Sequence, residues 1–411
     1  MRTGRLLTYE NGILLLLGLT FGFLFFDRNA AGFLGPFIAP DLGLSNWQIG
    51  FISSGLSITW AISAYVFGAA SDRSGIRKPF LIGCVLLFSA CSFLSGIAGS
   101  FLTLVAARML MGLAEGPFLP VALSIMAVES GERRRGVNMG VLQNFFSALL
   151  GSTAAPLALV AVAQHYNWRI AFFVAGVPGL VCALLIAKYV REPARPPASP
   201  AAHAERTPHA FGQMLRIRNV WLCSLISCFM VAWMVLGWAF LPVFFVRYRH
   251  FSADDMGKVM SVLGVCAAVG GFLVPALSDR IGRKPVMIVF LLLGALCPLA
   301  ALYYTGPLYA LAGLMFLGWL ASGAFPLYMG TIPAESTSPR LIATSMGLVV
   351  GIGEIVGGFM GPPLAGWVAD RTTLAAPILI EAGCAVVGGL LAFALVETAP
   401  AKVRARGPAT V

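Results

Sequence analysis

Charged residues are scarce in this chain. Only 11% of its 411 residues are Asp, Glu, Lys or Arg, whereas soluble globular domains carry about 25%. Because 58% of the residues are hydrophobic, no soluble core in a chain of this length can bury them all. Lipid is the solvent that tolerates such a composition. The chain is therefore predicted to be an integral membrane protein.

Histidine is also rare, and ordered cysteine patterns are absent. None of the four His residues falls in the middle of an apolar run, which argues against a histidine proton relay. The eight Cys residues lie in apolar runs without the spacing of a metal site or a disulfide framework. No nucleophile elbow, zinc-spaced His pair or phosphate-cradling glycine loop fits the predicted helices. We therefore expect no enzyme, no ATP-driven pump, no metal and no cofactor.

Long apolar runs are abundant. A helix needs about 20 residues to cross about 30 Å of hydrocarbon, and it satisfies its own backbone hydrogen bonds there. The first run starts near Gly12, lacks a small-residue cleavage site and is predicted to be a retained helix. Twelve runs are long enough to span: 11–36, 47–70, 79–99, 101–127, 138–163, 169–189, 219–246, 257–277, 285–304, 306–332, 342–368 and 374–397.

A segment rich in Pro, Ala and Arg divides these runs into six and six. It extends from about Arg191 to Pro208 and has the composition of a linker. The predicted fold is therefore an all-α membrane protein with twelve transmembrane helices in two six-helix halves. The halves are residues 1–190 and 219–411, joined by a cytoplasmic linker over residues 191–218.

The basic residues predict the orientation of these helices. With the N-terminus inside, 21 of the 28 Lys and Arg residues fall in cytoplasmic segments and 5 in the opposite loops and their edges. This bias is the positive-inside signature, so the net charge of +11 reflects membrane orientation rather than nucleic-acid binding. We expect a multi-pass protein of the cell inner membrane with both termini cytoplasmic.

A charged loop motif occurs twice, at matching places in the two halves. The first copy runs from Gly68 to Lys78 with the sequence GAASDRSGIRK, and the second from Pro275 to Lys284 with the sequence PALSDRIGRK. An Asp at a helix end can accept hydrogen bonds from the N-terminal amides of a neighbouring helix, and Arg can pair with carboxylates nearby. An ordinary basic loop that only sets orientation is the alternative. The predicted gating residues are Asp72, Arg73, Arg77, Asp279 and Arg280.

The motif is the loop signature of the major facilitator superfamily, which the sequence resembles over essentially its whole length. The second copy departs from the signature at Pro275, where Gly is usual. Arg108-x-x-x-Gly112-x-x-Glu115-Gly116-Pro117 and Phe26-Asp27-Arg28-Asn29 are similar to the anion:cation symporter branch, whose members move organic anions, commonly with protons. The resemblance implies that Asp27 and Glu115 are linked to protons and that Arg28 contacts the substrate.

Four charged residues lie inside the predicted spans of the first half. Arg108 and Glu115 are seven residues apart, so they share one helix face about 10 Å apart along the axis, and we expect both to face a central cavity. The side chains of the neighbouring residues Asp27 and Arg28 point in directions about 100° apart around the helix axis. A substrate carboxylate bound by Arg28 or Arg108 would compete with the acids for that Arg, and a freed acid would then favour a proton. Structural ion pairs that lock spans one and four are the alternative.

Other polar and aromatic residues give weaker signals. Gln143 and Asn144 could bind a carboxylate or could hydrogen-bond between helices, and Trp238 could line a cavity or pack. Glu354 is a lone acid in a Gly-rich helix and a candidate for the cavity. Glu381 receives no role. These assignments complete the predicted substrate site, which consists of Arg28, Arg108, Gln143, Asn144, Trp238 and Glu354.

The predicted function is proton-coupled symport of a small organic anion by alternating access. Its partners would be the anion, protons and the lipid bilayer, and we expect a monomer that binds no nucleic acid. A drug or lipid exporter of the same fold and a membrane receptor that does not transport remain alternatives. Organophosphate exchange is disfavoured, because the second half has no Lys or Arg in the middle of a span.

Overall fold

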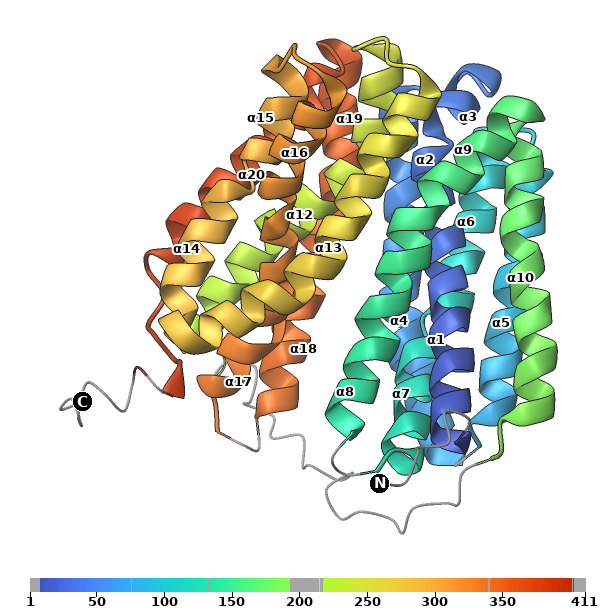
Figure 1. The fold of residues 1–411 in the computed structure, drawn as a ribbon, viewed down its shortest axis with the longest axis vertical. Helices are drawn as coiled ribbons and strands as arrows, with labels where there is room; N and C mark the ends of the chain where they lie inside the picture. The colour runs from blue at the N-terminus through green and yellow to red at the C-terminus, as the bar shows by residue number, and fades with distance from the viewer. Residues whose placement is uncertain are drawn as a thin grey trace, which may run out of the picture. The chain divides into compact units, whose positions relative to one another are not determined.

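The apolar runs form helices, and in the described ranges every regular element is helical (Figure 1). The computed structural model describes residues 8–74, 76–131, 134–192, 214, 217–338, 341–400 and 402, with the backbone alone at residues 65, 68–74 and 343. The all-α prediction is confirmed. The chain separates into two units: unit 1 is Met1–Leu44, Phe51–Arg195 and His250–Val265, and unit 2 is Ser45–Gly50, Pro196–Arg249 and Cys266–Val411.

Helices from the first part of the chain are interrupted at several points within the predicted spans. In order they are α1 (Tyr9–Arg28), α2 (Ala30–Phe33), α3 (Gly35–Asp41), α4 (Asn46–Ser74), α5 (Lys78–Gly96), α6 (Phe101–Glu115), α7 (Phe118–Glu129), α8 (Arg135–Gly140), the π-helices η1 (Val141–Phe145) and η2 (Ser147–Ala154), α9 (Ala155–His165) and α10 (Trp168–Tyr189).

Helices from the second part show the same kind of interruption. They are α12 (Arg218–Arg247), α13 (Ala253–Ile281), α14 (Arg283–Leu293), α15 (Leu296–Tyr303), α16 (Leu308–Trp319), the 3₁₀-helix η4 (Leu320–Ala324), the π-helix η5 (Leu327–Thr331), α17 (Ile332–Glu335), α18 (Ile342–Gly353), the π-helix η6 (Glu354–Met360), α19 (Gly361–Arg371) and α20 (Ala375–Ala392).

Eleven helices of the described chain are long and apolar enough to cross a membrane. The predicted span that is not among them, 47–70, corresponds to α4, which has 29 residues and several positions whose side chains lie outside the described residues. Twelve spans are consistent with this count. The predicted division at residues 190 and 219 stays a prediction, because most of the linker lies outside the described residues.

Polar side chains fix the starts of three helices. The Thr8 hydroxyl accepts a hydrogen bond from the Asn11 amide at α1, and the Asn167 carbonyl oxygen caps α10. At α6, Ser100 and Thr103 form a capping box in which each side chain accepts from the other residue's amide. These caps satisfy amides that have no partner within the helix, so they define where each helix begins.

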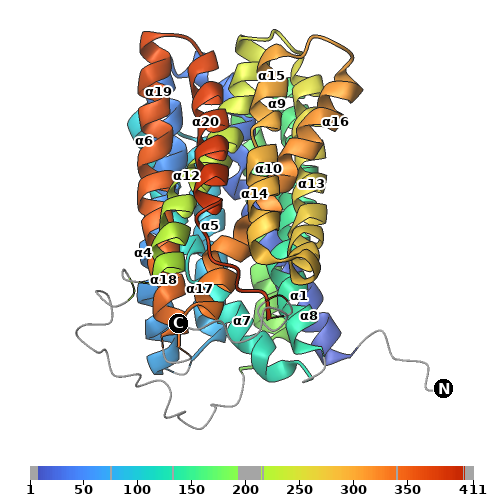
Figure 2. The same ribbon diagram turned by 90° about the vertical axis from the view of Figure 1, so that its left-hand side faces the viewer.

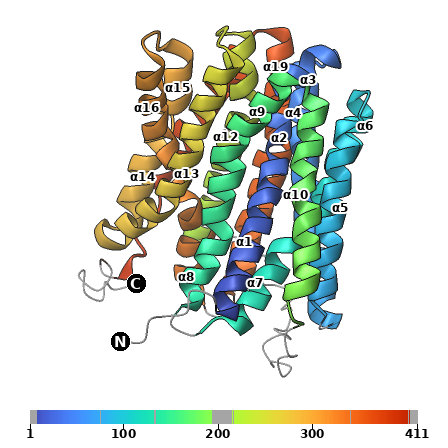
Figure 3. The ribbon, with the colours of Figure 1, turned by 45° about the vertical axis from the view of Figure 1, so that its right-hand side comes forward.

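In unit 1, α1 lies between α10 and the span built from η1, η2 and α9 (Figure 3). Its buried face packs with α5, α7 and α10 into one apolar core. At one end of the unit, Asp41 of α3 accepts from the side chains of Trp168 and Arg169, and the Arg169 hydrogen bond is the main reason that the pKa of Asp41 lies below its ordinary value. Representative core residues are Leu17, Phe21, Leu24, Val85, Phe88, Phe118, Ile125 and Ile186.

Glycines let α4 approach α6 closely. A Cβ built at Gly116 would lie 2.5 Å from the Trp60 carbonyl oxygen and 2.6 Å from the Ser63 hydroxyl. A Cβ at Gly112 would collide with Thr59. Two glycines four residues apart therefore form one contact face on α6, as in small-residue helix packing in membranes. This packing brings Trp60 of α4 beside the end of α1.

In unit 2, α14 lies alongside α20, and α12 also packs against α20 (Figure 2). Trp233 and Trp319 are buried in this unit with ring centroids 4.5 Å apart. The Trp233 indole N–H donates to the Gly294 carbonyl oxygen over 3.1 Å, at the point where α14 ends. The indole thus satisfies a carbonyl that the helix end leaves free.

Gly116→Ala is expected to destabilise the protein by roughly 1–3 kcal/mol, because its methyl group overlaps the α4 backbone. Thermal unfolding of the purified protein measures the effect. Gly83→Ala is the matched control, since a Cβ there meets no heavy atom within 4 Å. Equal melting temperatures for the two variants would contradict the close α4–α6 packing.

Candidate functional site

Two helix ends bring the four charged residues of unit 1 together. α1 ends at Arg28, and Asn29 separates it from α2. α6 ends at Glu115, where Gly116 and Pro117 break the span before α7. Proline removes a backbone donor and interrupts a helix, so the break after Glu115 follows from the sequence. Interrupted membrane helices expose polar backbone groups where charges can gather.

Arg108 and Asp27 form a fully buried pair between α6 and α1. The Arg108 Nη1 atom lies 3.5 Å from Asp27 Oδ1, and both side chains have 1% or less of their surface exposed. The Arg108 guanidinium also lies over the Phe172 ring, 5.8 Å from its centroid. Removing either partner would leave an uncompensated charge in an apolar interior, which is costly.

Arg108 also caps the C-terminal end of α1. Its Nη2 atom donates to the Asp27 carbonyl oxygen over 3.1 Å and to the Arg28 carbonyl oxygen over 2.6 Å. The last carbonyls of a helix lack partners within the helix and carry partial negative charge. One guanidinium therefore neutralises the Asp27 carboxylate and fixes the backbone that presents Arg28.

Arg28 and Glu115 form the second pair, with a looser geometry. Arg28 Nη1 lies 3.8 Å from Glu115 Oε2, and 18% of the Arg28 side chain is exposed while Glu115 is fully buried. Both Glu115 oxygens lack a hydrogen-bond partner among the residues that the structure describes. The Arg28 guanidinium stacks on Trp60, 5.0 Å from its ring centroid, and also lies near Phe25. Of the four charged groups, Arg28 is the accessible one.

The structure corrects the predicted positions of Arg108 and Glu115. The sequence spacing predicts that both side chains face a central cavity, but each residue is only 1% exposed. For Arg108 the reason is that α1 ends beside it, so its donors are used on α1 carbonyls and Asp27. Arg108 and Asp27 form an ion pair between spans one and four, and their roles in substrate binding and proton coupling stay predictions.

Gln143 and Asn144 lie on the exposed surface of η1, which packs against α1. The Asn144 amide donates to the Gly140 carbonyl oxygen over 3.4 Å, within its own span. A π-helical turn widens the helix and is frequent at functional sites. Next to η1, the Asn29 amide donates to the Gly151 carbonyl oxygen of η2 over 3.0 Å, which joins the α1 break to this span.

Trp238 and Glu354 belong to unit 2 and have their own neighbours there. The Trp238 ring meets Trp319 edge-on with centroids 5.1 Å apart, and Glu354 opens the π-helix η6. Glu381 is fully buried, and neither of its oxygens has a hydrogen-bond partner among the described residues.

The second loop motif forms a charge network that is centred on Arg283. Its guanidinium pairs with Asp279 at 2.5 Å and with Glu335 at 2.9 Å. The Thr398 hydroxyl donates to Glu335 over 2.6 Å. Arg280, the basic residue that we predict for this role from the sequence, is exposed and has no ion pair in the described structure. Asp279 and Arg283 lie on different helices, because α13 ends at Ile281 and α14 begins at Arg283. Gly282, with a φ of 116°, turns the chain between them, and the Arg283 guanidinium meets Asp279 across this turn.

Two glutamates cap the helices that follow the two loop motifs. The sequence analysis did not identify either of them. Glu192 accepts from the amides of Arg77 and Lys78 at 2.6 and 2.9 Å. Glu397 accepts from the amides of Arg283 and Lys284 at 2.8 and 3.1 Å.

The two glutamates, Glu192 and Glu397, are separated by nearly the same number of residues as the two copies of the loop motif. Each follows the last span of its half, so their repetition is the signal that could have revealed them. Carboxylates at helix N-termini are stabilised by free amides and the helix dipole. Of the predicted first motif, the Arg77 guanidinium donates to the Ser124 carbonyl oxygen at 3.4 Å, while the side chains of Asp72 and Arg73 lie outside the described residues.

Comparisons with known proteins agree with this architecture. The sequence profile of the Major Facilitator Superfamily matches residues 17–265 and 234–410. The 3-(3-hydroxy-phenyl)propionate transporter of Escherichia coli (strain K12) is 29% identical over 90% of this chain and 90% of its own. The hexuronate transporter of Bacillus subtilis (strain 168) is 27% identical over 93% of this chain and 94% of its own. Among solved structures, a bacterial homologue of the human lysosomal transporter Spinster superposes with a TM-score of 0.75 at 19% identity, covering 94% of this chain and 95% of that one.

Arg108→Gln is expected to lower the unfolding free energy by about 3–5 kcal/mol, because it leaves Asp27 buried without its partner and uncaps α1. Thermal unfolding measures the loss, and the double variant Arg108→Gln/Asp27→Asn is expected to recover part of it. Arg169→Gln is the control: it breaks an exposed Arg–Asp pair in the same unit, which contributes less than about 1 kcal/mol. An Arg108 variant as stable as the Arg169 variant would refute the capping role.

Glu397→Ala is expected to free the first amides of α14, and Glu192→Ala those of α5. Each loss costs about 0.5–2 kcal/mol of local stability. Amide hydrogen exchange is the measurement: the first variant should accelerate exchange at Arg283 and Lys284 and leave Arg77 and Lys78 unchanged. The second variant should give the reverse pattern, and acceleration at both helices in either variant would argue against two separate caps.

Proposed function

The chain belongs to the major facilitator superfamily, and from that premise we propose that it carries a small organic carboxylate together with protons. It is a multi-pass membrane protein and not an enzyme. The observation that carries the proposal is Arg28, a partly exposed guanidinium that is held over an aromatic ring and paired loosely with a buried acid.

The chemistry of Arg28 suits a carboxylate ligand. A guanidinium presents a planar set of donors that can bind both oxygens of a carboxylate at once. The contact to Glu115 at 3.8 Å is longer than a good charge-assisted hydrogen bond, so a substrate carboxylate can compete for the same donors. Trp60 adds an apolar, aromatic surface beside the guanidinium.

The names of the relatives support this ligand class. Hydroxyphenylpropionate and hexuronate both carry one carboxylate next to a part that differs greatly, a phenol ring in one and a polyhydroxylated chain in the other. A site in which an arginine binds the common carboxylate and other residues contact the variable part would accept either compound. Gln143, Asn144, Trp238 and Glu354 are our candidates for contacting the variable part.

Proton coupling follows from the competition for Arg28. When a substrate anion occupies the guanidinium, Glu115 loses its countercharge in a buried site, and a proton is then the species that can neutralise it. Binding of anion and proton thus favour each other. Glu115 suits this role better than Asp27, because Asp27 keeps Arg108 as its partner.

The remaining assignments complete the proposal. We place the protein in the cell inner membrane with both termini cytoplasmic, on the basis of the distribution of Lys and Arg, and we propose that it acts as a monomer. The loop motifs and their caps would stabilise one state of an alternating-access cycle. A drug or lipid exporter of the same fold is the competing function, and its transport would not depend on the Arg28 charge.

Arg28→Ala is expected to raise the KM for 3-(3-hydroxyphenyl)propionate uptake by about tenfold or more in proteoliposomes with an imposed pH gradient. The reason is that a hydrogen bond to a charged group contributes about 1.5–3 kcal/mol. Arg371→Ala is the matched control, because it also removes an Arg that stacks on a Trp, at 3.7 Å from the Trp367 centroid. Uptake by Arg28→Ala with an unchanged KM would contradict the carboxylate site and favour the exporter.

A further inference from the structure

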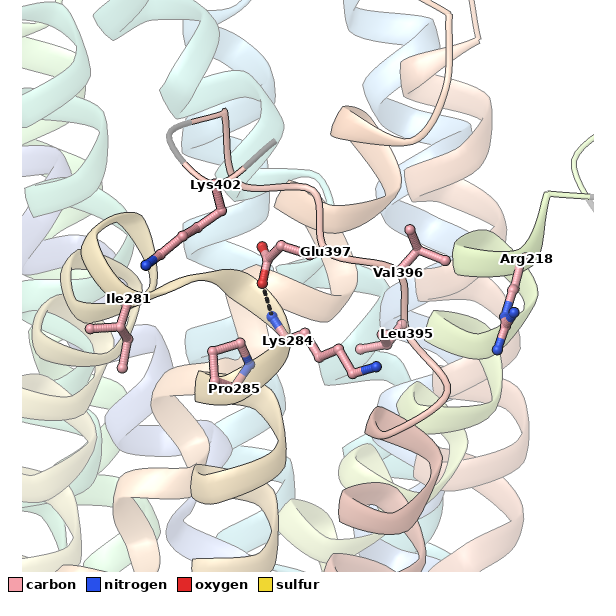
Figure 4. A pocket seen from close by; sticks show the side chains of 8 residues that line it. All are labelled: Arg218, Ile281, Lys284, Pro285, Leu395, Val396, Glu397 and Lys402. Carbon is pink, nitrogen blue, oxygen red and sulfur yellow. Dashed lines mark hydrogen bonds between the residues drawn. The ribbon is translucent and has the colours of Figure 1, made fainter. Parts of the chain in front are cut away.

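A pocket of about 540 Å³ opens in unit 2 beside the second loop motif (Figure 4). It lies between the end of α13, the start of α14, the first residue of α12 and the segment that follows α20. The proposed transport site does not use it. Its lining combines charged and apolar side chains: Arg218, Ile281, Lys284, Pro285, Leu395, Val396, Glu397 and Lys402.

The pocket has an excess of positive charge. Arg218, Lys284 and Lys402 bring three cations, whereas Glu397 brings one carboxylate. That carboxylate is already engaged, because one oxygen accepts from the Lys284 amide (Figure 4) and the other from the Arg283 amide. The side chains of the three cationic residues form no hydrogen bond or ion pair with any part of the chain that the structure describes. Their charge is therefore available to an anion.

The apolar side of the pocket continues along two membrane helices. Ile281 and Val396 line the pocket and are exposed large hydrophobic residues. The helices α14 and α20 lie side by side, and exposed large hydrophobic residues occur on α14 (Val289), on α20 (Leu390) and directly after α20 (Phe393). A free phosphate would use the cations alone, while a phospholipid would use both the cations and this apolar surface.

We propose that this pocket binds the phosphate headgroup of an acidic phospholipid, whose acyl chains lie along α14 and α20. Basic pockets between membrane helices on the cytoplasmic side bind such headgroups, and each Lys or Arg near an anionic lipid surface adds to the attraction. The bound phosphate would sit next to the N-terminus of α14, whose first amides are held by Glu397. The lipid would thus contact the segment that joins α20 to the charge network of Arg283.

The test measures lipid binding to the purified full chain in non-ionic detergent, by thermal unfolding and native mass spectrometry. Cardiolipin is expected to raise the melting temperature and to remain bound. Zwitterionic phosphatidylethanolamine and inorganic phosphate are expected to do neither. An equal effect of inorganic phosphate would show a free-anion site, and an equal effect of phosphatidylethanolamine would show a site without charge selection; either result overturns the proposal.

Charge variants locate the site. Arg218→Gln/Lys284→Gln/Lys402→Gln is expected to weaken cardiolipin binding by about tenfold or more. The matched control neutralises three exposed basic residues of unit 1 and so removes the same charge: Arg134→Gln, Arg135→Gln and Lys188→Gln.

The control variant should bind cardiolipin like the wild type. Each of the three single substitutions in the pocket should weaken cardiolipin binding. The single variants keep the test informative if the triple variant does not fold. Equal binding by the pocket variant and the control would overturn the proposal. None of these measurements depends on substrate transport, so a failure here is distinguishable from a failure of the proposed function.

Discussion

The burial of Arg108 against the C-terminal end of α1 is the interaction on which the rest of the site depends. A guanidinium in an apolar interior must be neutralised and must use its donors. Arg108 does both, with the Asp27 carboxylate and with the carbonyls of Asp27 and Arg28. Because those carbonyls belong to the residues that carry the site, the same contact fixes the direction of Arg28. The proposed exchange at the Arg28–Glu115 pair takes place beside the fully buried Arg108–Asp27 pair.

Helix ends recur as the places where this protein puts charge. Arg108 occupies the C-terminal end of α1, while Glu192 and Glu397 occupy the N-terminal ends of α5 and α14. In each case the sign of the side chain opposes the partial charge of the helix end. The two glutamate caps hold the helices that follow the two copies of the loop motif. The proposed lipid pocket includes one of these caps, Glu397, among its lining residues.

The fold could be predicted from hydropathy and charge distribution, because lipid imposes length and composition on every span. The charged residues of the site were also identifiable, since ionisable groups in spans are rare. Their pairing was not. A spacing of seven predicted that Arg108 and Glu115 share one helix face about 10 Å apart. It could not predict that α1 stops at Arg28 or that Gly112 and Gly116 bring Trp60 close to Arg28. Tertiary contacts decide both. The pairing of Asp279 with Arg283 could not be predicted either, because the chain turns at Gly282 between α13 and α14. The glutamate caps required the two ends of each half to be seen together.

The central claim is that a substrate carboxylate takes Arg28 from Glu115 and that Glu115 then takes a proton. Proton uptake on ligand binding tests this most directly, with a pH indicator in weakly buffered detergent solution as 3-(3-hydroxyphenyl)propionate is added to the purified protein. We predict that the wild type takes up protons as the acid binds and that Glu115→Gln binds the acid without taking up protons. Binding by the wild type with no proton uptake, or equal uptake by the variant, would contradict the account.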